Sequence, residues 1–310
     1  MTGLVTDAMM AEAVVAAGLD PAAAEAGHAA LASPSYMALE SRSVRVRDVF
    51  VKCMHPEVRA LFALSVAMQA AAQAGEAAAG PRVIWADAAQ GAIAMDLLGA
   101  GWITARQHDL QRPAVMQGVV AAMLRLHGSA PLPVRFDPFA QIDATVRALE
   151  AEGAALPHDI DWLIGLTDML RPLAAGGTLA PCRNDGSCSN LMIGPEDRVM
   201  LVDYDRAGMN DPLYDLGCVM AELTDHEDEM APVHEAYAGR SDPVGFARAR
   251  LWSHVDDMLH ALWARLMAHR SERRSVEWIK YGEWRLLRLR LALCHPLFEA
   301  RVRLATSGGV

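Results

Sequence analysis

Three polar residues between positions 181 and 217 stand at a spacing that suits phosphoryl transfer. Asn190 follows Asp185 by five residues, and Asp203 ends a short apolar run. Transfer from a nucleoside triphosphate uses a carboxylate facing the acceptor hydroxyl, an amide oxygen on Mg²⁺ and a second carboxylate on Mg²⁺. A lone loop aspartate more often caps a turn, so the argument depends on the whole triplet. We expect Asp185 to act as the base and the other two residues to bind metal.

The local pattern around the triplet predicts how it is positioned. Residues 191–193 and 199–202 read as short strands around a turn, which would present Asn190 and Asp203 on neighbouring strand ends. Asp205 follows in the sequence DYD. It either contributes to the shell of a second metal or hydrogen-bonds the loop, and we group it with the substrate-side residues.

Apolar periodicity divides the chain into a small mixed part and a larger helical part. We expect an α+β fold with an N-terminal lobe at 1–98 and a helical C-terminal lobe at 99–310, separated at Gly99–Gly101. The N-terminal lobe would begin with one or two short helices, followed by an antiparallel sheet with one helix. The predicted helices span 4–31 in part, 56–74, 113–127, 138–152, 159–174 and most of 215–304, and the predicted strands lie within 35–53, 82–87 and 91–98.

Lys52 ends the predicted strand VFVK in the N-terminal lobe. A lysine at the end of an edge strand is usually solvated, so the residue alone carries little weight. Together with the downstream triplet, it is the natural contact for the α- and β-phosphates of a nucleotide.

Composition narrows the range of partners and compartments. The net charge of −10 disfavours nucleic acid and is compatible with a cationic small substrate. Five cysteines without a CxxC pair indicate reduced thiols, and we expect a cytoplasmic protein. Neither a signal peptide nor a membrane span is expected, because the N-terminus lacks a basic region and the longest apolar run is too short. A homodimer is left open.

Aromatic residues gather near the C-terminus at helical spacing. By default such residues fill a core, but a few aromatic faces beside carboxylates would also form a cage for a cation. The cluster comprises Trp252, Trp263, Trp278, Tyr281 and Trp284.

These segments resemble the choline/ethanolamine kinase branch of the aminoglycoside-phosphotransferase-like kinases. CRNDGSCSNLMI is similar to the family's C-H-N-D-x4-N loop, and LVDYDRAGMNDPLYDLG is similar to its metal-loop segment. The resemblance implies a two-lobed protein-kinase-like fold, ATP with Mg²⁺, and a small-molecule hydroxyl acceptor. It also implies a catalytic role for Asp185, metal binding by Asn190 and Asp203, and a phosphate contact by Lys52. On the substrate side it points to Glu222, Trp263 and Tyr281, and we add Trp284 from the aromatic cluster as a further substrate-binding candidate.

The chain departs from the family pattern at four places. Arg183 replaces the catalytic-loop histidine, and His260 stands where a choline kinase usually has tryptophan. The segment 33–40 takes the place of the nucleotide loop but has no glycine, so Ser33 and Ser35 become its nucleotide-binding candidates. The predicted helix 56–74 has only Glu57, in its first turn, to pair with the phosphate lysine.

These departures leave two alternatives open. The chain could be a non-catalytic or weakly active binding or regulatory protein on a kinase fold. If it is an enzyme, an aminoglycoside, homoserine or a sugar could be the acceptor instead of a choline-like cation.

Overall fold

The chain divides into two compact units in the computed structural model, which describes residues 3–27, 38–175 and 177–307. Among these residues, the first unit comprises 3–27, 38–135 and 180–209, and the second comprises 136–175, 177–179 and 210–307. Residues 99–135 and 180–209 therefore cluster with the N-terminal sheet. Two contacts hold them there. Leu201 N donates to Ala79 O at 2.7 Å, and helix α3 (Leu64–Glu76) packs against helix α5 (Pro113–His127). The lobe boundary at 98/99 remains a prediction.

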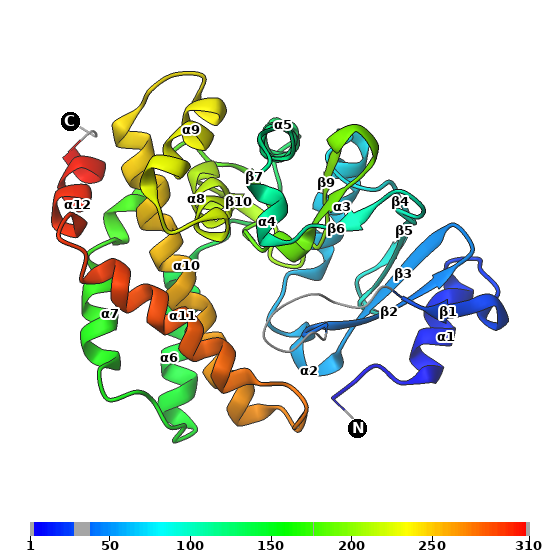
Figure 1. Cartoon of the computed structure of the whole chain (residues 1–310). Coiled ribbons are helices and arrows are strands. Elements are labelled where there is room, and N and C mark those ends of the chain that lie inside the picture. The colour runs from blue at the N-terminus through cyan, green and yellow to red at the C-terminus, as the bar shows by residue number, and fades with distance from the viewer. Residues whose placement is uncertain (1–2, 28–37, 176, 308–310) are drawn as a thin grey trace. The chain divides into compact units, whose positions relative to one another are not determined.

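A five-stranded antiparallel sheet forms the centre of the first unit, with strand order β1-β2-β3-β5-β4 (Figure 1). The β2–β3 hairpin turns at Arg47, whose φ is 56°. Helix α1 (Asp7–Ala16) packs against β3 and buries Val14 over Val51 and other apolar residues of the sheet. The strands are β1 (Ala24–Ala26), β2 (Ser41–Val46), β3 (Val49–Met54), β4 (Val83–Asp87) and β5 (Ala92–Asp96).

Two helix predictions in the N-terminal part were wrong in detail. Residues 24–26 form strand β1 instead of a helix, because they pair with residues 44–46 of β2 and tertiary pairing overrides the helical preference of alanine. The single helix expected at 56–74 is two helices, α2 (Pro56–Arg59) and α3 (Leu64–Glu76).

The remaining elements of the first unit surround the predicted triplet. Strand β8 (Leu191–Ile193) pairs antiparallel with β9 (Val199–Leu201), which confirms the predicted hairpin. Strand β6 (Ile103–Thr104) pairs with the other edge of β8, and β7 (Ala180–Cys182) pairs with β10 (Gly208–Asn210). The helices are α4 (Gln107–Leu110) and α5 (Pro113–His127), and α5 packs against α3, β7 and β9.

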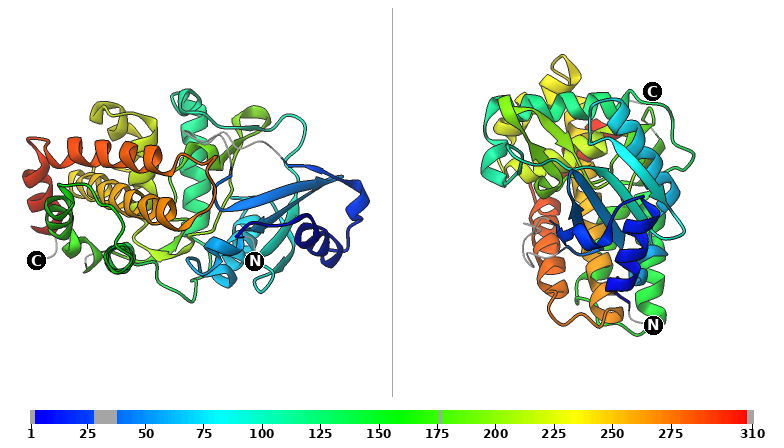
Figure 2. Two further views of the ribbon diagram at one scale, coloured as in Figure 1. Left: turned by 90° about the horizontal axis from the view of Figure 1, so that it is seen from below. Right: turned by 90° about the vertical axis from the view of Figure 1, so that its right-hand side faces the viewer.

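The second unit is helical and is organised around the 28-residue helix α10 (Pro243–Arg270). Helix α11 (Trp278–Leu293) lies along α10 in both views of Figure 2, and α6, α8 and α12 also pack on α10. The other helices are α6 (Pro138–Ala151), α7 (Ile160–Asp168), α8 (Pro212–Leu223), α9 (Glu227–Ala238) and α12 (Phe298–Ser307). The helix expected at 159–174 therefore ends at 168, and a 3-10 turn (Arg171–Ala175) follows it.

Three helices of the second unit begin with the same dipeptide, Asp-Pro. The aspartate caps the helix by accepting a backbone N–H, and proline fits the first helical position because its missing N–H would have no partner there. The side chains of Asp137, Asp211 and Asp242 accept from Ala140, Leu213 and Gly245. The core of this unit contains the fully buried Tyr214 and Leu251.

Among the described residues, no helix combines the length and the apolar character needed to cross a membrane.

Candidate active site

Lys52 lies in the interior of the first unit's sheet, not at the end of an edge strand. It pairs with Ser43 of β2 on one side and Ile93 of β5 on the other. Its Nζ donates to Asp203 Oδ1 at 2.8 Å and to Asp205 Oδ2 at 2.7 Å. The lysine side chain is 13% exposed, so these two contacts fix a largely buried ammonium group.

The electrostatics of this trio follow from two carboxylates sharing one ammonium group. Burial alone would lower the pKa of Lys52, but Asp203 and Asp205 outweigh it and raise the pKa above its usual value. Burial likewise opposes ionisation of Asp203, yet Lys52 holds the pKa of that carboxyl below its usual value. Burial and the neighbouring Asp203 charge raise the pKa of Asp205 to about 8. Asp203 therefore keeps its charge, and Asp205 is protonated first.

Asp203 occupies an unusual backbone conformation just after β9. Its φ is 65°, in the left-handed region that non-glycine residues rarely adopt. Such conformations persist where the surrounding structure fixes them, and they gather at functional positions. Here Val202 N donates to Asn190 O at 3.0 Å, so the hairpin places the metal candidates Asn190 and Asp203 at the same end of β8 and β9.

Asp185 and Asn190 contact each other directly. Asp185 Oδ2 accepts from Asn190 Nδ2 at 2.5 Å, and its other oxygen accepts from Ser187 N at 2.7 Å. The side-chain nitrogen Nδ2 of Asn190 is thus the donor to the predicted base. The side-chain oxygen Oδ1 of Asn190 is the atom chemically suited to a metal. The structure brings the predicted base, both predicted metal ligands and the predicted phosphate lysine into one contact network.

Two neighbours of this network were not predicted. Glu40 lies 4.0 Å from Arg206, and burial raises the pKa of Glu40 to about 6 despite the opposing charge of Arg206. In the sequence, Glu40 only ends a loop segment without glycine, and no pattern marks its carboxylate as part of a site. Ser33 and Ser35 lie outside the described residues.

The backbone around Asp185 is held by the two residues that precede it. Asn184 is fully buried with a φ of 57°, and its Nδ2 donates to Arg206 O at 2.9 Å. Arg183 is 2% exposed and donates to three backbone carbonyl groups of the site.

Three of the four predicted substrate-side residues of the second unit, Glu222, Trp263 and Tyr281, belong to one connected cluster of charges and rings. Glu222 of α8 accepts from Arg288 Nη1 at 3.3 Å. Trp263 is 5% exposed and meets Tyr281 edge-on, with ring centroids 6.1 Å apart. Trp284, by contrast, is 59% exposed. The predicted roles of these residues in binding an acceptor remain predictions.

Guanidinium groups of the chain itself already occupy aromatic faces in this cluster. The Arg285 guanidinium carbon lies 5.5 Å from the centre of the Tyr281 ring, and Arg273 lies 4.9 Å from the centre of the Trp278 ring. Arg285 also donates to Asp257 Oδ1 at 2.8 Å. His260 stands at the position where choline kinases usually have tryptophan. Its Nδ1 lies 3.1 Å from the backbone oxygen of Asp256, one turn earlier in α10.

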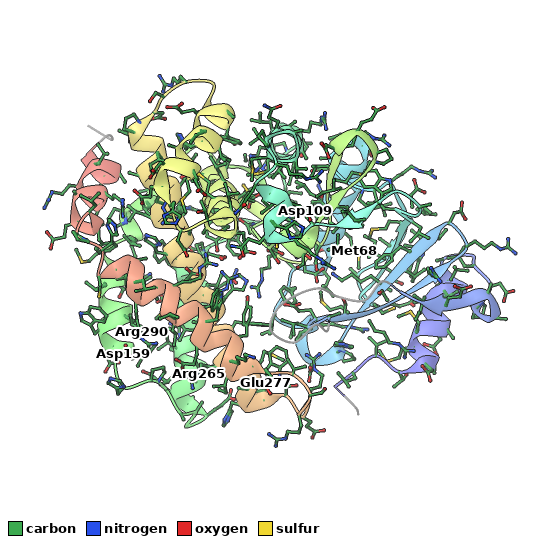
Figure 3. The ribbon with its side chains drawn as sticks, viewed as in Figure 1. Met68, Asp109, Asp159, Arg265, Glu277 and Arg290 are labelled. Carbon is green, nitrogen blue, oxygen red and sulfur yellow. The ribbon has the colours of Figure 1, made fainter. Side chains whose placement is uncertain are left out.

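A more exposed ion pair lies elsewhere in this unit. Arg290 of α11 lies against Asp159, just before α7, with Nε–Oδ2 and Nη2–Oδ1 distances of 2.7 and 2.9 Å (Figure 3). Arg290 Nη1 also lies 3.5 Å from Glu283 Oε2, and the Arg290 side chain is 29% exposed, so the Arg290–Asp159 pair offers a reference for a partly exposed ion pair.

Comparison with known proteins places this arrangement among phosphotransferases. Residues 38–252 match the model of the phosphotransferase enzyme family APH. Protein LicA of Haemophilus influenzae is 23% identical over 196 residues, which cover 60% of this chain and 70% of that protein.

Solved structures share the fold over most of the chain. A choline/ethanolamine kinase family protein from Mesorhizobium loti has a TM-score of 0.81 at 24% identity, covering 97% of this chain and all of that one. Choline kinase LicA from Streptococcus pneumoniae has a TM-score of 0.74 at 16% identity, covering 92% and 98%. These likenesses confirm the predicted α+β kinase-like fold and the predicted family resemblance.

Proposed function

Because the chain belongs to the phosphotransferase enzyme family, we propose that it transfers the γ-phosphate of ATP to a hydroxyl group of a small molecule with the help of Mg²⁺. The observation that carries this proposal is the contact network of the first unit. There Lys52 binds Asp203, and Asn190 binds Asp185. Phosphoryl transfer depends mainly on positioning and charge stabilisation, and this network supplies both.

The donor set at the end of the β8–β9 hairpin fits Mg²⁺. The ion prefers hard oxygen ligands and keeps several waters, so one carboxylate and one amide oxygen beside phosphate oxygens are sufficient. Asp203 and Asn190 would hold it, and the bound ion would neutralise charge on the phosphate oxygens.

The other side chains of the network have separate tasks. Asp185, oriented by Ser187 N and the Asn190 amide, accepts the proton of the acceptor hydroxyl or orients that hydroxyl. Lys52 presents a fixed positive charge to the α- and β-phosphates. Asp205 holds the Lys52 ammonium group in place from the loop after β9, a task that the family resemblance assigns to a helix glutamate.

A direct assay tests the proposed function. The protein is incubated with ATP and Mg²⁺ and with ethanolamine, choline, homoserine, an aminoglycoside or a sugar, and ADP and the phosphorylated product are measured. We expect acceptor-dependent ADP that disappears when the metal is chelated. Stabilisation by Mg²⁺ and ATP without turnover of any acceptor class would instead favour a binding or regulatory protein.

For the acceptor, we propose a small amino alcohol carrying a primary ammonium group in preference to a quaternary one. Both classes fit the acidic net charge, but only the quaternary ion depends on open aromatic faces. The faces of Tyr281 and Trp278 already carry Arg285 and Arg273. The cytoplasmic location and the homodimer remain predictions.

This acceptor proposal gives an expected order of substrates. Choline should have a kcat/KM at least about fivefold below that of ethanolamine, because one lost cation–π face amounts to about 1 kcal/mol. Initial rates of ADP formation over a concentration series of both alcohols measure the ratio. A preference for choline would show that the arginines move aside and that the aromatic faces do bind the substrate.

A further inference from the structure

Arg183 makes a set of contacts that its replacement of a histidine does not suggest. It follows directly after β7, and its side chain is almost completely buried within the first unit. Nη1 donates to Asn190 O at 2.7 Å and to Val202 O at 3.0 Å, while Nη2 donates to Asp185 O at 2.6 Å. One guanidinium group therefore binds the backbone at three places.

Each of these carbonyl groups belongs to the candidate machinery or directly precedes it. Asp185 is the proposed base, Asn190 is a proposed metal ligand, and Val202 is bonded covalently to Asp203. Two other bonds link these segments in pairs: the Asp185–Asn190 side-chain bond and the bond from Val202 N to Asn190 O. Arg183 contacts all three segments at once, so it restrains the distances between them.

Arginine is chemically suited to this task in a way that histidine is not. A guanidinium group carries five N–H donors in a fixed planar fork, whereas a neutral imidazole carries one donor and a charged imidazole two. A histidine here would leave at least one of the three carbonyl groups without this donor. A buried acceptor that loses its hydrogen bond is costly, and the backbone would shift to recover a partner.

We infer that Arg183 is a positioning residue that fixes the base Asp185 relative to the metal ligands Asn190 and Asp203 by binding the backbone of all three segments. This inference rests on the proposed function. It also gives the departure from the family pattern a meaning: the catalytic loop is held by a different side chain, and it is not degraded.

The test compares Arg183→His, Arg183→Lys and Arg183→Met with the unchanged protein. Residues that orient metal ligands without touching the metal typically contribute 10–100-fold to metal affinity or activity. We expect Arg183→His to lower kcat and the affinity for Mg²⁺ by about 10–100-fold and to leave the acceptor KM within about twofold. The lysine variant, which keeps the charge but loses the fork, should lose nearly as much as the methionine variant.

A control and a second readout separate positioning from simple loss of stability. Arg290→Met removes an arginine that binds Asp159 and should leave kcat and the Mg²⁺ affinity unchanged. Mn²⁺ binding in the presence of ATP, followed by electron paramagnetic resonance, reports the metal site without any acceptor. Hydrogen exchange at the amides of Asn190 and Val202 reports whether the hairpin end has loosened.

Each outcome decides the inference. Weaker Mn²⁺ binding and faster exchange in Arg183→His support it, even if no acceptor is ever turned over and the proposed function fails. Activity and Mn²⁺ binding equal to or above those of the unchanged protein overturn it, because histidine would then serve as well. A lower melting temperature with unchanged kcat and Mn²⁺ affinity also overturns it, since Arg183 would then stabilise the fold only.

Discussion

Asp203→Asn is expected to reduce turnover by on the order of 10²–10⁴-fold, the range seen when a group that stabilises transition-state charge is removed. The substitution keeps the size of the side chain but removes one of the two carboxylates that bind Lys52 Nζ. It also removes the only charged group of the proposed metal pair. The loss should therefore appear in kcat and in the Mg²⁺ requirement together.

Asp197→Asn provides a matched control on the same hairpin. Asp197 also has a positive φ, 55° compared with 65° at Asp203, and asparagine tolerates this backbone region well. Its carboxylate binds Arg112 at 2.9 Å, away from the Lys52 trio. Steady-state kinetics and thermal shifts with Mg²⁺ and ATP should show a loss only for Asp203→Asn. If the two variants had the same kcat and the same Mg²⁺ requirement, Asp203 would have no role in catalysis.

The triplet could be read from the sequence because its geometry is local. Residues 190–203 form one hairpin, and two short apolar runs around a turn are enough to predict that Asn190 and Asp203 share an end. The contact between Asp185 and Asn190 is equally local, spanning five residues along a single loop.

The partner of Lys52 could not be found in the same way. Asp205 is 153 residues away in sequence, and nothing in either segment marks the pairing. The family resemblance predicts a glutamate in the helical segment 56–74 as the partner of this lysine. In the structure the carboxylate comes instead from Asp205, in the loop after β9, and only the tertiary fold brings it to Lys52. Strand β1 is a similar case, because its three residues become a strand only through pairing with β2.

The role of Arg183 was hidden for a different reason. The sequence shows which residue has been replaced but not where the new side chain points. A buried arginine is costly unless its donors are satisfied, so its position beside three carbonyl groups follows from desolvation. The carbonyl groups that satisfy its donors come together only when the surrounding loops are folded, so the sequence alone does not reveal them.

Arg285→Met is expected to destabilise the protein by about 3–5 kcal/mol, the range seen when one partner of a buried ion pair is removed. Arg285 Nη1 donates to Asp256 Oδ2 at 3.2 Å and to Asp257 Oδ1 at 2.8 Å, and both aspartates are 2% exposed. Methionine retains part of the volume and none of the charge. The second unit would therefore contain two adjacent buried carboxylates with less positive charge between them.

The size of this effect should depend on pH in a defined direction. Burial already raises the pKa of Asp257 despite Arg288 and Arg285, and loss of Arg285 raises it further. A carboxyl group whose pKa is higher in the folded state than in the unfolded state binds more protons when folded, so stability falls as pH rises. The free energy lost on Arg285→Met should consequently be smaller at pH 5 than at pH 8.

Urea denaturation of both proteins at the two pH values measures this loss, with Arg290→Met on the same helix as control. The Arg290–Asp159 pair is more exposed, with side chains 29% and 20% accessible, and its removal should cost about 1 kcal/mol or less with little pH dependence. A loss from Arg285→Met as small as that of the control would mean that the other partners of the two carboxylates are sufficient: Arg288 beside Asp257, and His260 and Tyr214 beside Asp256. In that case Arg285 would be dispensable to the helical core, and the Tyr281 face that it covers would be open to a cationic acceptor at little cost.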